Sequence, residues 1–169
     1  DETDVAQAAA DSTVNGRVGM YDENGGSINL AAPGLDAATG TAFAVAPGGA
    51  MKAPAFPLAD FTITGWFRSD SLGALPADLR LVFGQGEGTP EVALLEAGGA
   101  LHYYGDETIL FSSEVGTIET GQAYHIAVTF DSSSGEVALI LNGVEVATGS
   151  APLPSSDGEF YVGAYGANG

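Results

Sequence analysis

Turn-forming residues interrupt this sequence at short intervals, and this spacing restricts the fold more than any other feature. Gly and Pro account for 33 of the 169 residues (25 + 8). Together with Asn, Asp and Ser they form clusters roughly every 8–12 residues, and the runs between the clusters are rich in β-branched and aromatic residues. Runs this short suit strands and leave little room for helices. We therefore expect an all-β sandwich or barrel.

Twelve strands are predicted, which is enough for two sheets packed face to face. The predicted ranges are Arg17–Tyr21, Ser27–Ala31, Thr41–Ala46, Phe61–Arg68, Leu79–Phe83, Glu91–Glu96, Ala100–Tyr104, Thr108–Ser112, Tyr124–Phe130, Glu136–Leu141, Val144–Thr148 and Glu159–Ala164. One stretch, Asp4–Ala10, has the composition of a short helix or of a frayed acidic terminus. We expect residues 1–12 to be an acidic N-terminal tail and residues 13–169 to form one β-sandwich domain.

Local patterns identify the faces of the predicted strands. In the range 61–68, Phe61, Ile63 and Phe67 alternate with polar positions, and Trp66 belongs to the polar set. Because successive side chains of a strand point to opposite faces, Trp66 is predicted to lie opposite the buried residues. The dipeptide Asn142-Gly143 joins two alternating runs and predicts a type I′ hairpin turn, since both residues tolerate positive φ. Asp131–Gly135, five residues long and containing Gly, predicts a second turn.

Charge and composition exclude several classes of function. Acidic residues outnumber basic ones by 22 to 4, a net charge of −18, so we expect no nucleic-acid partner and no binding to anionic membranes. The longest apolar run is far shorter than the ~18 residues of a membrane span, so membrane insertion is not expected either. The sequence has no Cys and only two His, which excludes disulfides, thiolate chemistry and multi-histidine metal sites.

Several blocks, taken in order, resemble the laminin G-like branch of the concanavalin A-like lectin/glucanase superfamily. Asp60–Asp70 (DFTITGWFRSD) is similar to a strand of that family, and Tyr124–Asp131 (YHIAVTFD) is similar to a second one. The second block continues into Leu141–Gly143 (LNG) and Val146–Gly149 (VATG), and Phe160–Ala164 (FYVGA) resembles a later strand. The matching region runs from about Gly40 to Ala164. The resemblance implies a two-sheet antiparallel jelly-roll β-sandwich. It implies much less about function, because one fold occurs with many different sites.

The resemblance also bears on catalysis. Endoglucanases of the superfamily use two catalytic carboxylates, which a strand with three acidic positions, Glu-x-Asp-x-x-Glu, presents. The most similar segment here is Glu2-Thr3-Asp4-Val5-Ala6-Gln7, where Gln7 replaces the third carboxylate. We therefore expect a chain that is not an enzyme.

Candidate site residues follow partly from the resemblance and partly from residue type. The loop Asp22-Glu23-Asn24 is similar to a loop that often binds calcium in laminin G-like domains, so Asp22, Glu23 and Asn24 are candidate Ca²⁺ ligands. An ordinary Gly-rich turn is the alternative. Trp66, Tyr103 and Tyr165 are candidate ligand-binding aromatics, with core packing as the alternative for each. His102 and His125 are expected to be packed or hydrogen-bonded rather than metal-bound.

Two functions fit these observations. The first is a secreted, non-catalytic module for adhesion or recognition, which binds a glycan or a surface protein and is stabilised by calcium. The second is a structural subunit of an extracellular filament or surface layer. In the family a further strand follows the FYVGA block. Either the sequence stops before that strand, or the sandwich lacks it and has an open sheet edge near Arg17–Tyr21 for self-assembly. A start without Met and without a leader pattern fits a mature extracellular protein or a trimmed piece.

Overall fold

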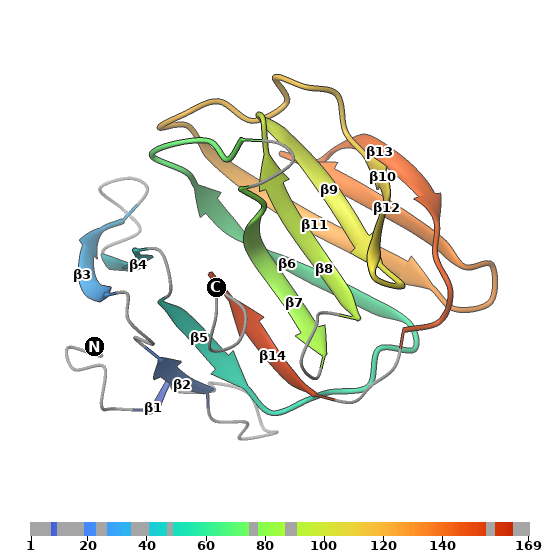
Figure 1. Cartoon of the computed structure of the whole chain (residues 1–169), viewed down its shortest axis with the longest axis horizontal. Helices are drawn as coiled ribbons and strands as arrows, with labels where there is room; N and C mark the ends of the chain where they lie inside the picture. Colours follow the sequence, from blue (N-terminus) through green and yellow to red (C-terminus); the bar gives the residue numbers. More distant parts are fainter. Residues whose placement is uncertain are drawn as a thin grey trace.

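Antiparallel strands make up the regular structure in this computed structural model, which describes residues 8–9, 19–22, 27–34, 41–46, 49–74, 78–86, 91–154 and 158–163. Fourteen strands are found there, and the described ranges contain no helix, so no helix in them could cross a membrane. The strands form a jelly-roll β-sandwich (Figure 1). The predicted fold class is confirmed.

Two sheets form the sandwich. The larger sheet has the order β1 (Ala8–Ala9), β2 (Gly19–Asp22), β5 (Ala50–Ala53), β14 (Glu159–Val162), β7 (Arg80–Gly86), β8 (Val92–Ala97), β9 (Ala100–Gly105) and β10 (Thr108–Ser112). The smaller sheet has the order β13 (Val144–Ser150), β12 (Glu136–Leu141), β11 (Ala123–Asp131) and β6 (Phe61–Arg68). A separate hairpin is formed by β3 (Ile28–Pro33) and β4 (Thr41–Val45). Figure 1 shows the eight-stranded sheet in front of the four-stranded one.

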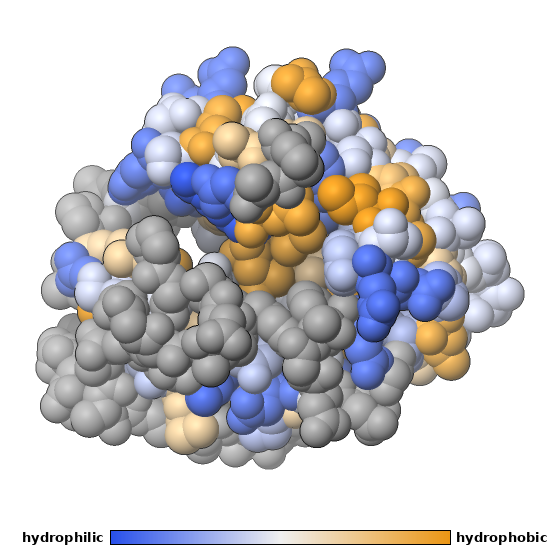
Figure 2. Space-filling model, in the orientation of Figure 1, coloured by the Kyte–Doolittle hydropathy of each residue, from blue (hydrophilic) through white to orange (hydrophobic). Residues whose placement is uncertain are grey.

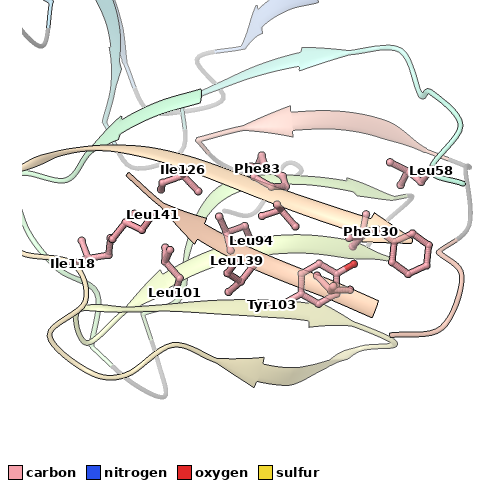
Figure 3. Packing of buried hydrophobic residues seen from close by; sticks show 13 residues of the cluster. Leu58, Phe83, Leu94, Leu101, Tyr103, Ile118, Ile126, Phe130, Leu139 and Leu141 are labelled. Atoms are coloured by element: carbon pink, nitrogen blue, oxygen red, sulfur yellow. The ribbon is translucent and has the colours of Figure 1, made fainter. Parts of the chain in front are cut away.

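The hydrophobic core lies between the two sheets. Leu94 and Leu101 of the larger sheet and Val128 and Leu139 of the smaller one are completely buried (Figure 3). Alternation explains their placement, because every second residue of each strand points inward. Burial of such a side chain contributes about 1.5–3 kcal/mol. The outward-facing residues do not take part in this core and can contact a ligand.

The predicted hairpin turn at Asn142-Gly143 is confirmed. Asn142 has φ 52° and Gly143 has φ 81°, as a type I′ turn requires. Asp131–Gly135 forms the other predicted turn, in which the Gly135 N–H donates to the Asp131 carbonyl over 2.8 Å. These two turns determine how β11, β12 and β13 follow one another across the smaller sheet.

Three expectations about elements differ from the structure. Ala8 and Ala9 pair with Met20 and Gly19 as a strand, so the helical alternative is wrong at these two residues. β5 was not predicted, since its sequence AMKA has no β-branched residue and it becomes a strand by pairing with β2 and β14. β2 lies between β1 and β5, so the edge expected to be open near Arg17–Tyr21 is paired over Gly19–Asp22. A strand beyond β14 would fall outside the described residues.

Candidate functional site

Trp66 is the most exposed large aromatic side chain in the described part of the chain. It lies on β6, and 64% of its surface is accessible. Phe61, Ile63 and Phe67 of the same strand pack against the core, so strand alternation turns Trp66 outward. The predicted position of Trp66 is confirmed. Trp is enriched at interfaces, where its large apolar ring and its N–H can both find partners.

His125, on the neighbouring strand β11, contacts the indole of Trp66. The register pairs Trp66 of β6 with His125 of β11, and the two rings meet edge to face at 5.3 Å between centroids and 65° between planes. The Thr64 Oγ1 lies 2.8 Å from His125 Nε2 and donates its own hydrogen to the Ile126 carbonyl at 3.1 Å. Because that hydroxyl has one hydrogen, we assign the hydrogen between Thr64 and His125 to Nε2. Nδ1 of the neutral imidazole is then an acceptor.

Asn142 fixes the backbone of His125 from the hairpin turn. The Asn142 N–H donates to the His125 carbonyl over 2.8 Å, and the His125 N–H donates to Asn142 Oδ1 over 2.9 Å. With Oδ1 occupied, the two Nδ2 hydrogens of this exposed side chain are available to a ligand. Trp66, His125 and Asn142 therefore form a row across β6, β11 and the β12–β13 turn, which we call the Trp66 platform.

An open pocket of about 290 Å³ lies further along the same two strands. Its lining residues are Asp60, Phe61, Thr62, Thr129, Phe130, Asp131 and Glu136. Thr62 pairs with Thr129, and Trp66 pairs with His125. The two pairs are four residues apart along each strand, and an even spacing keeps the side chains on one face. The pocket and the Trp66 platform thus share one sheet face, about 13 Å apart at 3.3 Å per residue.

The pocket carries negative charge. The pKa of Asp60 is lowered, mainly because its carboxylate accepts hydrogen bonds from the Ser132 hydroxyl (2.6 Å) and the Ser132 N–H (2.8 Å). The pKa of Asp131 is lowered in the same way by the hydroxyl and N–H of Ser133. Both carboxylates are therefore ionised at neutral pH.

The other predicted ligand-binding aromatics do not join this platform. Tyr103 is 1% exposed and its ring stacks on Phe111 at 5.3 Å in the core, so the prediction that it contacts a ligand is corrected. Burial also raises the pKa of its hydroxyl. Tyr165 lies outside the described residues. Among the three predicted ligand-binding aromatics, Trp66 is the one that the described part of the chain places on the platform.

The predicted calcium loop is only partly described. Glu23 and Asn24 lie outside the described residues, and only the backbone of Asp22 is described, in β2. Within the described ranges, no three His, Asp or Glu side chains gather into a metal site. The calcium prediction at Asp22, Glu23 and Asn24 stays a prediction.

Two members of the platform were not predicted from the sequence. His125 was expected to be a packed imidazole and Asn142 a turn residue, and both descriptions are correct but incomplete. The signal that links them to Trp66 is the pairing register between β6 and β11. A sequence does not reveal register before the strands are paired.

The outer face of the eight-stranded sheet presents a second surface. Leu81, Ala93 and Leu95 form its floor, with the half-buried Tyr104 and Tyr161 packed against them. Figure 2 shows apolar side chains gathered in the middle of this face, over β7 and β8. The Tyr161 hydroxyl donates to Glu159 at 2.9 Å. This surface is mainly apolar, whereas the Trp66 platform combines an exposed ring with free polar groups.

Comparisons with known proteins identify the family of this chain. No curated protein matches the sequence. A crystal structure of a putative carbohydrate binding protein from Bacteroides ovatus is similar, with 21% identity, a TM-score of 0.48, and 63% of this chain covered against 31% of that one. Alginate lyase AlgAT5, from polysaccharide lyase family 7, has 12% identity, a TM-score of 0.44, and coverage of 92% and 68%. The chain spans about a third of the first of these proteins. The family model of the concanavalin A-like lectin/glucanases superfamily matches residues 46–169, and the chain belongs to this family.

Proposed function

We propose that this chain is a carbohydrate-binding module that holds a sugar ring on Trp66. The observation that carries the proposal is the 64% exposed indole, which His125 contacts and whose neighbours offer hydrogen-bonding groups. The less polar face of a sugar ring packs on an aromatic ring, while its hydroxyls need acceptors and donors at the rim. His125 Nδ1 supplies an acceptor and Asn142 Nδ2 supplies donors. Membership of a lectin and glucanase superfamily is compatible with this proposal.

Binding without catalysis is the form of the function that we propose. Glycoside hydrolysis needs one carboxyl group with a raised pKa to act as the acid. The pKa values of Asp60 and Asp131, which line the pocket beside the platform, are shifted downward instead. Incubating the protein with oligosaccharides should therefore release no new reducing ends, and their release would contradict this part of the proposal.

Trp66→Ala tests the proposal. We expect the variant to lose at least about 30-fold in affinity for a glycan identified on an array, because removal of a central Trp typically costs ~2 kcal/mol or more. Its melting temperature should stay close to that of the wild type, since the side chain is exposed. Isothermal titration calorimetry measures the affinity.

Two controls locate the site. Leu153→Ala removes a side chain of equal exposure, 64%, and should leave affinity unchanged. Tyr161→Ala alters the opposite sheet face. If Tyr161→Ala abolishes binding and Trp66→Ala does not, the Trp66 platform is not the binding surface.

The remaining expectations are proposals as well. We propose that the module acts outside the cell, in adhesion or recognition, and that the Asp22–Asn24 loop binds a stabilising calcium ion. Self-assembly as a filament or layer subunit is the second candidate function. It is favoured by β6, an eight-residue strand that is outermost in the four-stranded sheet as far as that sheet is described.

A further inference from the structure

We propose that the site accepts an extended oligosaccharide without anionic groups, lying along β6 and β11 from the Trp66 platform to the pocket at Thr62 and Thr129. This inference rests on the proposed function and adds the ligand's length and charge. It uses the alignment of two features along the same pair of strands: an exposed aromatic ring and a pocket on the same sheet face.

The sheet register provides the track for a linear ligand. Trp66 pairs with His125, Thr64 with Ala127, and Thr62 with Thr129. Between the two ends the outward positions are small, since they are occupied by Thr64 and Ala127. A chain of sugar rings can therefore lie flat on the strands without a large side chain blocking it. A disaccharide on Trp66 is too short to reach Thr62, about 13 Å away.

The groups at the pocket end favour hydroxyl-bearing ligands. The hydroxyls of Thr62 and Thr129 both donate and accept hydrogen bonds, and the carboxylate of Glu136 at the rim accepts them. Hydrogen bonds to a charged acceptor are stronger than neutral ones. The pocket thus supplies partners for the sugar hydroxyls beyond the reach of Trp66.

The charge of the same groups opposes acidic sugars. Asp60, Asp131 and Glu136 line the pocket, and a uronate or sulfate beside them would meet like charge. Arg68 is the cationic residue of β6, and its side chain is paired with Asp70 at 3.1 Å. The net charge of −18 adds long-range repulsion of polyanions.

Calorimetry with matched oligosaccharides tests the proposal. The neutral set comprises gluco-, xylo- and manno-oligosaccharides from the disaccharide to the hexasaccharide, and the anionic set comprises alginate and polygalacturonate oligosaccharides of the same lengths. We expect a neutral hexasaccharide to bind at least about tenfold more tightly than its disaccharide, the equivalent of one or more added hydrogen bonds. The anionic set should show no binding at low ionic strength.

Two variants assign the gain to the pocket. Thr62→Val removes a hydroxyl and keeps the β-branched shape, so the hexasaccharide should lose about two- to tenfold in affinity and the disaccharide should lose none. Thr108→Val, on the exposed start of β10, is the matched control and should change neither.

The outcomes separate this inference from the proposed function. If Trp66→Ala abolishes binding but length and Thr62→Val have no effect, the extended site is wrong and the platform remains. Binding of the anionic set as tight as that of the neutral set would overturn the charge assignment. If no glycan of either set binds and an array stays blank, the proposed function itself fails, and this inference falls with it.

Discussion

A single carboxylate, Asp60, joins two parts of the molecule that are 72 residues apart in the chain. It lies just before β6 and accepts hydrogen bonds from the hydroxyl and N–H of Ser132, in the turn after β11. These bonds favour the charged form, so the pKa of Asp60 in the folded protein is below its ordinary value of 3.8. A group with a lowered folded pKa stabilises the protein above its unfolded pKa, and the stabilisation is lost as pH falls through the folded pKa.

We therefore predict that Asp60→Ala lowers the free energy of unfolding at pH 7. The difference from the wild type should shrink as pH falls from about 3.8 through the lower folded pKa of Asp60, because the wild-type carboxylate then takes up a proton. Urea unfolding between pH 7 and pH 2.5 measures this. Asp60→Asn is the matched control, since it keeps an acceptor oxygen but cannot ionise and should lose the pH-dependent part alone. An Asp60→Ala effect that is equal at pH 7 and pH 2.5 would contradict the prediction.

At the scale of strands, the two sheets approach each other closely where β10 meets β13. A Cβ at Gly149 of β13 would lie 2.4 Å from the ring of Phe111 in β10, and that ring stacks on the buried Tyr103. Glycine is needed there because of this close approach, and its φ is not in the positive range. The ring of Phe111 can therefore pack at this position only because Gly149, in the other sheet, has no side chain.

Gly149→Ala should destabilise the fold by about 1–3 kcal/mol, as expected for overpacking. Gly65→Ala is the control, because a Cβ at Gly65 of β6 meets nothing within 4 Å. Combining Gly149→Ala with Phe111→Leu should recover part of the loss, since the smaller side chain makes room for the added methyl group. Thermal and urea unfolding measure all three variants. Equal effects of the two glycine substitutions would show that the contact with Phe111 is not the cause.

For the whole molecule, the net charge of −18 acts on association. Self-repulsion between chains weakens as salt shortens the Debye length to about 8 Å or less, so any pairing through the edge of β6 should be promoted by salt. A calcium ion in the Asp22–Asn24 loop would add to the effect and stabilise the fold by mass action.

We predict that sedimentation velocity shows larger species in high salt with calcium than in low salt with EDTA. The melting temperature should fall in EDTA. A monomer under all conditions would remove the filament proposal, and a melting temperature that EDTA does not change would remove the calcium proposal. Trp66→Ala serves as a control, because loss of the indole leaves the backbone edge of β6 intact.

Neighbouring tyrosines show what local pattern can and cannot predict. Tyr103 and Tyr104 are equivalent by residue type, and one of them must face outward because strand side chains alternate. Pairing places Tyr103 opposite Leu94 in the core and Tyr104 opposite Ala93 on the outer face. In the range 61–68 the alternation was strong enough to predict the faces, whereas in Ala100–Gly105 it was not.

The sequence by itself determined the all-β class, most strands, the two hairpin turns and the outward position of Trp66. These depend on the turn chemistry of Gly, Asn and Asp and on period-two alternation, which are local properties. Only the tertiary structure decided that His125 and Asn142 adjoin Trp66, that β5 is a strand, and that Thr129 lies opposite Thr62 in the pocket. The physical reason is register: which residues of distant strands lie opposite one another depends on the packing of the whole sandwich.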